Sequence, residues 1–155
     1  ANVTNKRYCR YMLGDPPFDL QTFLPYLINQ AAEGSSLEFH RIYKERYGML
    51  RAEWRVLFHL GIYQRMSAKE ISDKSKIHKT KVSRAVHKMQ QKGFLRRVPD
   101  QEDRRKEWLE LTKSGQAVYK DLLDLAQDYD QVLQDMFSKN DIATFKKILQ
   151  ALASR

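Results

Sequence analysis

The segment from Lys76 to Arg97 constrains the fold and the function of this chain more than any other part of its 155 residues. It contains no acidic residue, although the whole chain has 19 Asp and Glu beside 28 Lys and Arg. Its basic residues are Lys76, Lys79, Lys81, Arg84, Lys88, Lys92, Arg96 and Arg97. Such a concentration of positive charge is typical of a surface that binds phosphate, and the alternative interpretation is an ordinary solvated helix face.

The apolar residues of this segment predict a helix over residues 78–91. Val82, Val86 and Met89 recur at spacings of four and three, which places them on one face of a helix, and Ala85 widens that face. The basic and polar residues then lie on the opposite face. We therefore expect a helix that packs on a core with one side and presents positive charge with the other.

A shorter helix and a hairpin are predicted on either side of it. Ser67-Ala-Lys-Glu70 has the form of a capping box and predicts a helix over residues 68–74. Two short helices joined by a tight turn make a helix-turn-helix. Gly93 suits the left-handed position after a helix end. Strands predicted over residues 94–98 and 108–111, with a polar loop between them, then form a hairpin, or wing.

Longer helices are predicted before and after this central unit. One begins near Leu24 and ends before Gly48, and another over residues 51–60 ends at Gly61. A long helix follows Thr112 and a last one follows Ser138. The fold class is therefore mainly α with a small β wing. We expect a single domain with an N-terminal arm (1–18), dimerisation helices (20–50 and 112–155) and a winged helix-turn-helix DNA-binding lobe (51–111).

The outward-facing side chains of the 78–91 helix are suited to double-stranded DNA. Thr80, Ser83 and Arg84 combine hydrogen-bonding groups with charge, which base edges in a major groove require. The lysines are better placed to hold backbone phosphates. The DNA-binding residues predicted on this helix are His78, Lys79, Thr80, Lys81, Ser83, Arg84, His87 and Lys88.

The tip of the predicted wing carries three more basic residues. Arg104, Arg105 and Lys106 are expected to bind DNA, because an arginine on a thin wing can enter a minor groove, where the negative potential is strongest. Asp103 is expected to shape the tip through a hydrogen bond with a neighbouring arginine.

Four stretches, in order and at matching spacing, resemble the MarR family of bacterial and archaeal winged helix transcription factors (multiple-antibiotic-resistance regulators). They are Ser67–Asp73, His78–Arg84, Met89–Arg97, and Asp100–Arg105 followed by Leu111–Gly115. The resemblance covers about residues 20–153. It implies a cytoplasmic, nucleoid-associated prokaryotic protein, a homodimer that binds a palindromic operator and acts there as a repressor.

The resemblance also implies that the first and last helices form the dimer interface. Apolar residues recur at spacings of four and three between Val118 and Met136. This apolar stripe is longer than the core of a compact winged helix requires, which supports the dimer interface. An intramolecular helical hairpin would give the same pattern. The predicted interface residues are Leu24, Ile28, Val118, Leu122, Leu125, Tyr129, Val132, Met136, Phe145 and Leu149.

MarR-like proteins often release DNA when a small aromatic or phenolic acid binds, so the resemblance implies an effector of that class. The family's pocket lies between the dimerisation helices and the winged helix. By position, the candidate pocket residues are Tyr26, His40, Arg41, Tyr43, Trp54, Phe58 and Trp108. The alternative is that these aromatic residues belong to the core.

The sequence offers little for catalysis or metal binding. It has no nucleophile–base constellation, no glycine-rich phosphate loop and no His or Cys cluster, so we expect no enzyme, cofactor or metal. The lone Cys9, beside basic residues, leaves a redox-sensing regulator as one alternative. An architectural DNA-binding protein without a strict operator is another. No apolar stretch approaches the ~20 residues that a membrane helix needs, and no membrane partner is expected.

Overall fold

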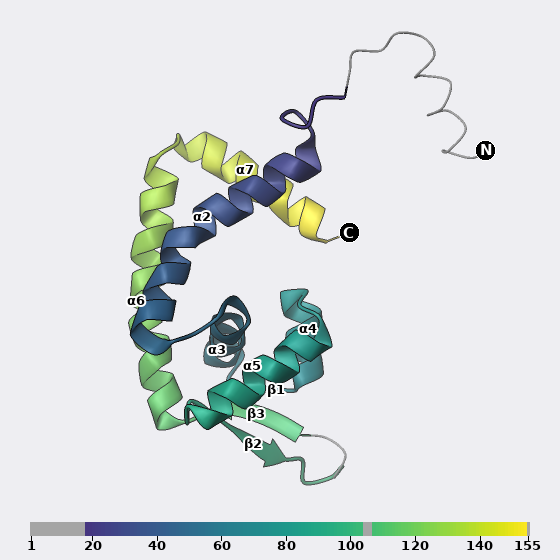
Figure 1. Ribbon diagram of the computed structural model, residues 1–155, viewed down its shortest axis with the longest axis vertical. Helices are drawn as coiled ribbons and strands as arrows, with labels where there is room; N and C mark the ends of the chain where they lie inside the picture. Colours follow the sequence, from purple (N-terminus) through teal and green to yellow (C-terminus); the bar gives the residue numbers. More distant parts are fainter. Residues whose placement is uncertain (1–17, 104–106, 155) are drawn as a thin grey trace, which may run out of the picture. The chain divides into compact units, whose positions relative to one another are not determined.

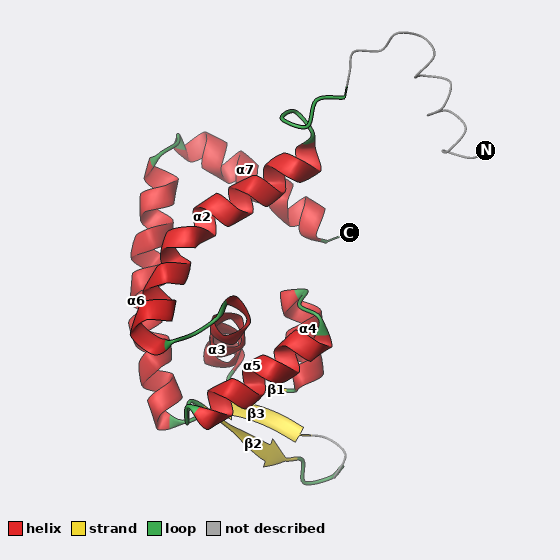
Figure 2. Ribbon diagram, in the orientation of Figure 1, coloured by secondary structure: helices red, strands yellow, loops and turns green. Residues whose placement is uncertain are grey.

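The computed structural model describes residues 18–103 and 107–154 of the chain. The helices among these residues are α2 (Leu24–Tyr47), α3 (Arg51–Tyr63), α4 (Ala68–Ser75), α5 (Lys79–Gln91), α6 (Lys113–Asp135) and α7 (Lys139–Ala153). The strands are β1 (Arg65–Met66), β2 (Leu95–Pro99) and β3 (Glu107–Leu111). The predicted fold class, mainly α with a small β wing, is confirmed (Figures 1 and 2). None of the described helices has the length and apolarity needed to cross a membrane.

The chain divides into two units, and α2 contributes to both. The first unit ends at Ser36 and the second begins at Leu37. In the first unit, a turn precedes α2: the Asp19 carboxylate accepts a hydrogen bond from the Gln21 N–H at 2.9 Å. The second unit contains the winged helix and all of its core, and the candidate functional residues are mostly there.

Local hydrogen bonds explain why α4 and α5 begin where they do. The Ser67 hydroxyl accepts from the Glu70 N–H at 3.2 Å, and the Glu70 carboxylate accepts from the Ser67 N–H at 2.7 Å, which confirms the capping box. The Ser67 N–H and hydroxyl both donate to the Glu70 carboxylate and hold its pKa below the usual value. His78 caps α5, because its Nδ1 accepts from the Thr80 N–H at 3.3 Å.

The inner face of α5 lies in the core of the second unit, as its spacing predicted. Val82, Ala85, Val86 and Met89 are all buried. They belong to one hydrophobic cluster with residues of α3, α4 and the sheet. This packing fixes the orientation of α5, and therefore which of its side chains face solvent.

The sheet has three antiparallel strands in the order β1-β3-β2. The hairpin of β2 and β3 is close to its predicted bounds, whereas β1 was not predicted. A strand of two residues is too short to give an alternating pattern, and it forms only because Arg65 pairs with Glu110 and Met66 with Leu109. The wing is thus anchored on both sides of β3.

The predicted end of the second helix at Gly61 is wrong. α3 continues to Tyr63, and Gly61 lies inside it. A Cβ at this position would overlap the ring of Tyr119, which packs there from α6. The glycine is therefore explained by close helix packing and not by a turn.

Replacing Gly115 with Ala is expected to destabilise the fold by about 1–3 kcal/mol, because an added Cβ would overlap the backbone carbonyl of Phe94. Gly34→Ala is the matched control, since a Cβ there meets nothing within 4 Å and the position is inside α2. It should be neutral or stabilising by up to about 1 kcal/mol. Urea unfolding of both variants measures the difference. Equal stability of the two would contradict the tight contact at Gly115.

Candidate DNA-binding surface

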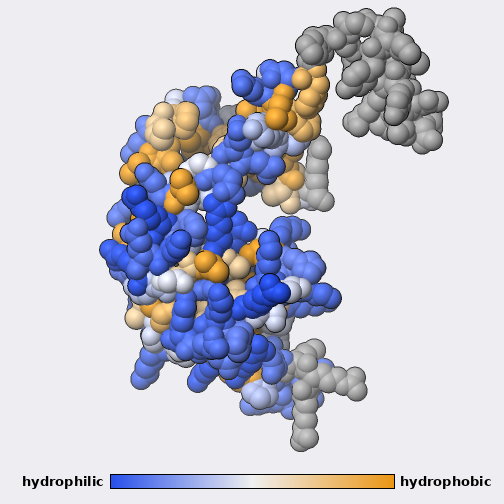
Figure 3. Space-filling view, in the orientation of Figure 1, coloured by the Kyte–Doolittle hydropathy of each residue, from blue (hydrophilic) through white to orange (hydrophobic). Residues whose placement is uncertain are grey.

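The outer face of α5 carries every residue predicted on it for DNA binding. His78, Lys79, Thr80, Lys81, Ser83, Arg84, His87 and Lys88 are all exposed. Thr80, Arg84 and His87 lie at spacings of four and three, so they share one stripe along the helix. In Figure 3, hydrophilic side chains cover the surface over α5. The face is therefore polar, basic and accessible along the whole helix.

The cations of this face are not neutralised within the described part of the chain. No ion pair among the described residues involves Lys79, Lys81, Arg84 or Lys88. Four positive charges thus project from three turns of one helix. Their mutual repulsion is relieved when an anion binds across them.

Three other basic residues of the 76–97 segment have a different role, which corrects the sequence interpretation. Arg96 donates to the Glu110 carboxylate at 2.8 Å and Arg97 to the Glu107 carboxylate at 2.6 Å, both across the hairpin. Lys92 pairs with Glu53 at 2.8 Å. The sequence pattern missed this because the acidic partners lie far away along the chain or on the opposite strand.

The ion pair of Lys92 and Glu53 joins three elements at the end of α5. The Glu53 side chain is only 2% exposed, and that of Lys92 is 28% exposed. The same ammonium group donates to the backbone carbonyls of Tyr47 at 3.3 Å and Gly48 at 2.8 Å. Lys92 therefore fixes the C-terminal end of α5 to the segment between α2 and α3.

The base of the wing is held by Asp100. Its Oδ1 accepts from the backbone N–H groups of Glu102 and Asp103, each at 2.9 Å. Its Oδ2 accepts from the indole N–H of Trp108 at 2.5 Å. The predicted wing residues Arg104, Arg105 and Lys106 lie outside the described residues. The predicted shaping role of Asp103 remains a prediction.

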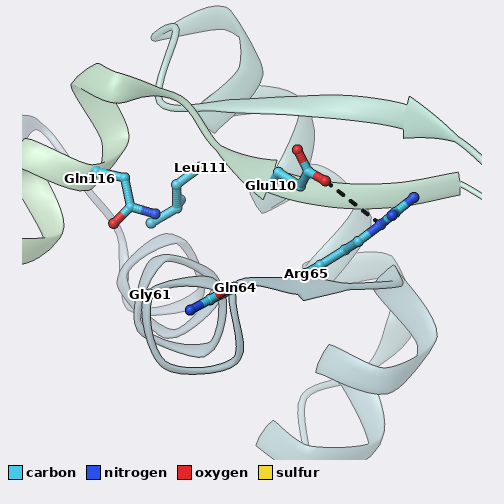
Figure 4. A pocket seen from close by; sticks show the side chains of 6 residues that line it. All are labelled: Gly61, Gln64, Arg65, Glu110, Leu111 and Gln116. Carbon is cyan, nitrogen blue, oxygen red and sulfur yellow. Dashed lines mark ion pairs between the residues drawn. The ribbon is translucent and has the colours of Figure 1, made fainter.

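Trp108 was predicted to line an effector pocket, and the structure corrects this. The indole lies at the wing, where the Arg65 guanidinium is 5.1 Å from the centroid of its ring. Arg65 also lines a separate polar pocket with Gly61, Gln64, Glu110, Leu111 and Gln116 (Figure 4). Sequence reasoning missed Arg65 and Asp100, because neither belongs to a helical pattern.

Three other predicted pocket residues form an aromatic cluster around Phe39. The ring centroids of Tyr43, Trp54 and Phe58 lie 5.4, 5.6 and 6.4 Å from that of Phe39. Tyr129 stacks on Phe39 at 6.0 Å. Phe39 itself was not singled out from the sequence. These aromatic residues pack in or against the hydrophobic core, as the alternative interpretation held.

Two polar atoms beside this cluster are buried without a hydrogen-bond partner among the described residues. They are Nε2 of His40 and the hydroxyl of Tyr43, whose rings lie 5.2 Å apart. Burial raises the pKa of Tyr43 to about 12, so the hydroxyl keeps its proton at neutral pH and can donate a hydrogen bond. His40 and Arg41 line a hollow of about 730 Å³ along α2. Tyr26 belongs to the first unit, where its hydroxyl accepts a hydrogen bond from the side-chain amide of Gln30.

The predicted dimer residues differ in their burial within the chain. Val118 and Leu122 are buried in the chain's own core, which corrects their assignment to an interface. Leu125 and Tyr129 pack against that core and are partly buried. Leu24, Val132, Met136 and Phe145 are each more than half exposed, whereas Ile28 and Leu149 are partly buried. In Figure 3, hydrophobic side chains lie at the surface where α6 leads into α7.

The remaining sequence prediction concerns Cys9, which lies outside the described residues. The described residues hold no group of three or more His, Cys, Asp or Glu side chains placed to bind a metal.

Comparison with known proteins agrees with this geometry. The model of the MarR family matches residues 47–106. A MarR/EmrR family transcriptional regulator from Acinetobacter sp. ADP1 is 26% identical, with a TM-score of 0.80 over 88% of this chain and 96% of that one. No curated protein sequence matches the chain.

Two further solved structures share the fold. A mutant MarR from E. coli, complexed with operator DNA, is 20% identical, with a TM-score of 0.77 over 89% of this chain and 99% of that one. The PcaV transcriptional regulator from Streptomyces coelicolor, in complex with its natural ligand, is 18% identical, with a TM-score of 0.76 over 90% and 98%. The MarR family model thus matches the winged helix region at residues 47–106, and most of the chain has the fold of MarR-family transcriptional regulators.

Proposed function

We propose that the protein is a homodimeric, sequence-specific repressor that inserts α5 into the major groove of a palindromic operator. The observation that carries the proposal is the exposed face of α5, where Lys79, Lys81, Arg84 and Lys88 make no ion pair within the described residues. An E. coli MarR structure with the same fold is complexed with operator DNA, which supports DNA binding by this chain. A protein of this kind acts at the nucleoid, in the cytoplasm of a prokaryotic cell.

The residues of α5 divide by chemistry into two roles. Lysine ammonium groups are compact charges, so Lys79, Lys81 and Lys88 hold phosphates and fix the position of the protein on DNA. Thr80, Ser83 and Arg84 have directional hydrogen-bonding groups and read base edges. An arginine is the side chain most suited to guanine, because its planar fork donates to two acceptors at once.

Arg84→Ala tests this division. If Arg84 reads a base, the variant should bind its operator more weakly by about 1–3 kcal/mol and lose discrimination at one position of each half-site. Lys147→Ala, which removes an exposed charge from α7, is the control and should leave operator affinity nearly unchanged. Fluorescence anisotropy with operator and single-substituted duplexes gives both numbers. An equal loss on all sequences would show that Arg84 contacts phosphate and does not read a base.

The exposed apolar residues of α6 and α7 support the dimer. Val132, Met136, Phe137, Phe145 and Ile148 are each at least half exposed. α7 has no buried residue, although Phe145 and Leu149 recur at helical spacing. Exposed apolar surface of this extent is typical of an interface. A two-fold dimer would cover it and present two copies of α5 to the two halves of a palindrome.

The second part of the proposal is a small aromatic acid effector that binds beside α2. His40 Nε2 and the Tyr43 hydroxyl are buried without a partner among the described residues, and such atoms are usually satisfied by a ligand or by water. His40 and Arg41 line a hollow along α2, where the guanidinium group of Arg41 can attract a carboxylate. The PcaV regulator, solved in complex with its natural ligand, shares the fold, which supports a ligand site in this chain.

Titration of benzoate and hydroxybenzoates into the protein–operator complex tests the effector. We expect release of DNA, and Tyr43→Phe should weaken the response by about tenfold, because it removes one hydrogen-bond donor and keeps the ring. Operator affinity without ligand should not change. Failure of every aromatic acid to release DNA would remove the effector from the proposal and leave DNA binding intact.

A further inference from the structure

Asp100 and Trp108 connect the two ends of the wing loop. Trp108 lies on β3, opposite Val98 of β2, and Asp100 follows directly after β2. One carboxylate oxygen of Asp100 orders the start of the loop through the N–H groups of Glu102 and Asp103. The other oxygen accepts from the Trp108 indole at 2.5 Å. This side-chain pair connects the start of the loop with the returning strand.

The indole is held in turn from the third strand. The Arg65 guanidinium of β1 lies 5.1 Å from the centre of the Trp108 ring, within the range of a cation–π contact. Its Nε is 3.6 Å from the carboxylate of Glu110, which also accepts from Arg96 at 2.8 Å. Figure 4 shows Arg65 directed toward Glu110 across the strands. Arg65 therefore restricts the ring that bonds with Asp100.

We infer that Asp100, Trp108 and Arg65 are positioning residues that hold the base of the wing and so determine the preference for DNA flanking each half-site. The inference rests on the proposed function, since it requires a wing that reaches DNA. A wing whose base is already held in place avoids part of the ordering cost of binding. A wing that is less well held would lose contact mainly where the contact is most favourable, in a narrow A·T-rich minor groove.

The residue types favour a positioning role over direct DNA contact. Asp100 is an anion and would be repelled by phosphate, so its carboxylate is better used to accept hydrogen bonds within the wing. Trp108 is partly buried, and its one polar atom already donates to Asp100. Phenylalanine in its place would keep a ring beneath Arg65 but would leave Asp100 without that donor.

The test compares Trp108→Phe, Asp100→Asn and the double variant with the unchanged protein on two duplexes. Both duplexes carry the selected half-sites, one with A·T-tract flanks and one with G·C flanks. We expect each single variant to lose about tenfold in affinity on the A·T-flanked duplex and little on the other. The Asn amide keeps one oxygen for the N–H groups of Glu102 and Asp103, so both substitutions remove the same bond between residues 100 and 108. The double variant should therefore bind about as well as the weaker single variant.

Discrimination within the half-site separates positioning from general damage. This discrimination depends on α5 and should be the same in all variants. Arg65→Lys keeps the charge but makes a weaker contact with the ring. Its thermal midpoint should equal that of the unchanged protein. An equal loss on both duplexes, or an unchanged flank preference, would overturn the inference while leaving the proposed function in place. An unchanged protein that binds neither duplex would overturn the proposed function and this inference with it.

Discussion

Lys92→Met should lower the free energy of unfolding by roughly 3 kcal/mol, the largest stability effect that we expect from a single polar substitution. The variant leaves the Glu53 carboxylate buried, at 2% exposure, without its cation. It also removes the donor to the carbonyls of Tyr47 and Gly48. The expected loss of stability is at the lower end of the range for a broken buried ion pair. One reason is that Lys92 is partly exposed to water. The other is that Glu53 lies in the first turn of α3, where the helix dipole favours an anion.

Two variants serve as controls for this prediction in urea unfolding. Lys81→Met makes the same substitution on the exposed face of α5 and should change stability by no more than about 0.5 kcal/mol. The double variant Glu53→Leu, Lys92→Met removes both charges and should recover most of the loss. A Lys92→Met protein as stable as the parent would show that Glu53 is hydrated and that the pair does not hold α5 in place.

Phe145→Asp should convert the protein to a folded monomer and weaken operator binding by about a hundredfold or more, because the second half-site then no longer binds as part of the same molecule. Phe145 is 51% exposed within the chain, so the charge disturbs the proposed interface and not the core. Leu125 is unsuitable for this test, because it packs against the core.

Lys147→Asp places the same charge on the opposite face of α7 and should remain dimeric. Sedimentation equilibrium gives the mass, and circular dichroism checks that each variant is folded. A Phe145→Asp protein that is still a dimer with unchanged operator affinity would show that the interface lies elsewhere.

The sequence predicted those features that depend on neighbours along the chain. The capping box at Ser67, the tight turn between the two short helices and the apolar stripe of Val82, Val86 and Met89 are local patterns, and each is confirmed. The exposed face of α5 followed from the same stripe, since residues that are not on the inner face of a helix must lie on the outer one. The candidate DNA-binding surface was therefore largely predictable.

Features that depend on distant partners were not predictable. The spacing of Val118 and Leu122 is the same as that of Val132 and Met136, yet the first pair is buried against the winged helix and the second is exposed. Periodicity identifies an apolar face but not what covers it. Likewise, Lys92 resembled Lys88 in the sequence as a basic residue of the same segment without acidic residues, whereas the fold brings Glu53 beside it.

The central claim is that α5 reads sequence, and selection from random duplex DNA tests it most directly. We predict an enriched inverted repeat, with half-sites about one helical turn apart, that is preferred over random DNA by at least ~10³-fold at physiological salt. Absence of any enriched motif, with steeply salt-dependent binding to every duplex, would contradict the claim and would identify an architectural DNA-binding protein instead.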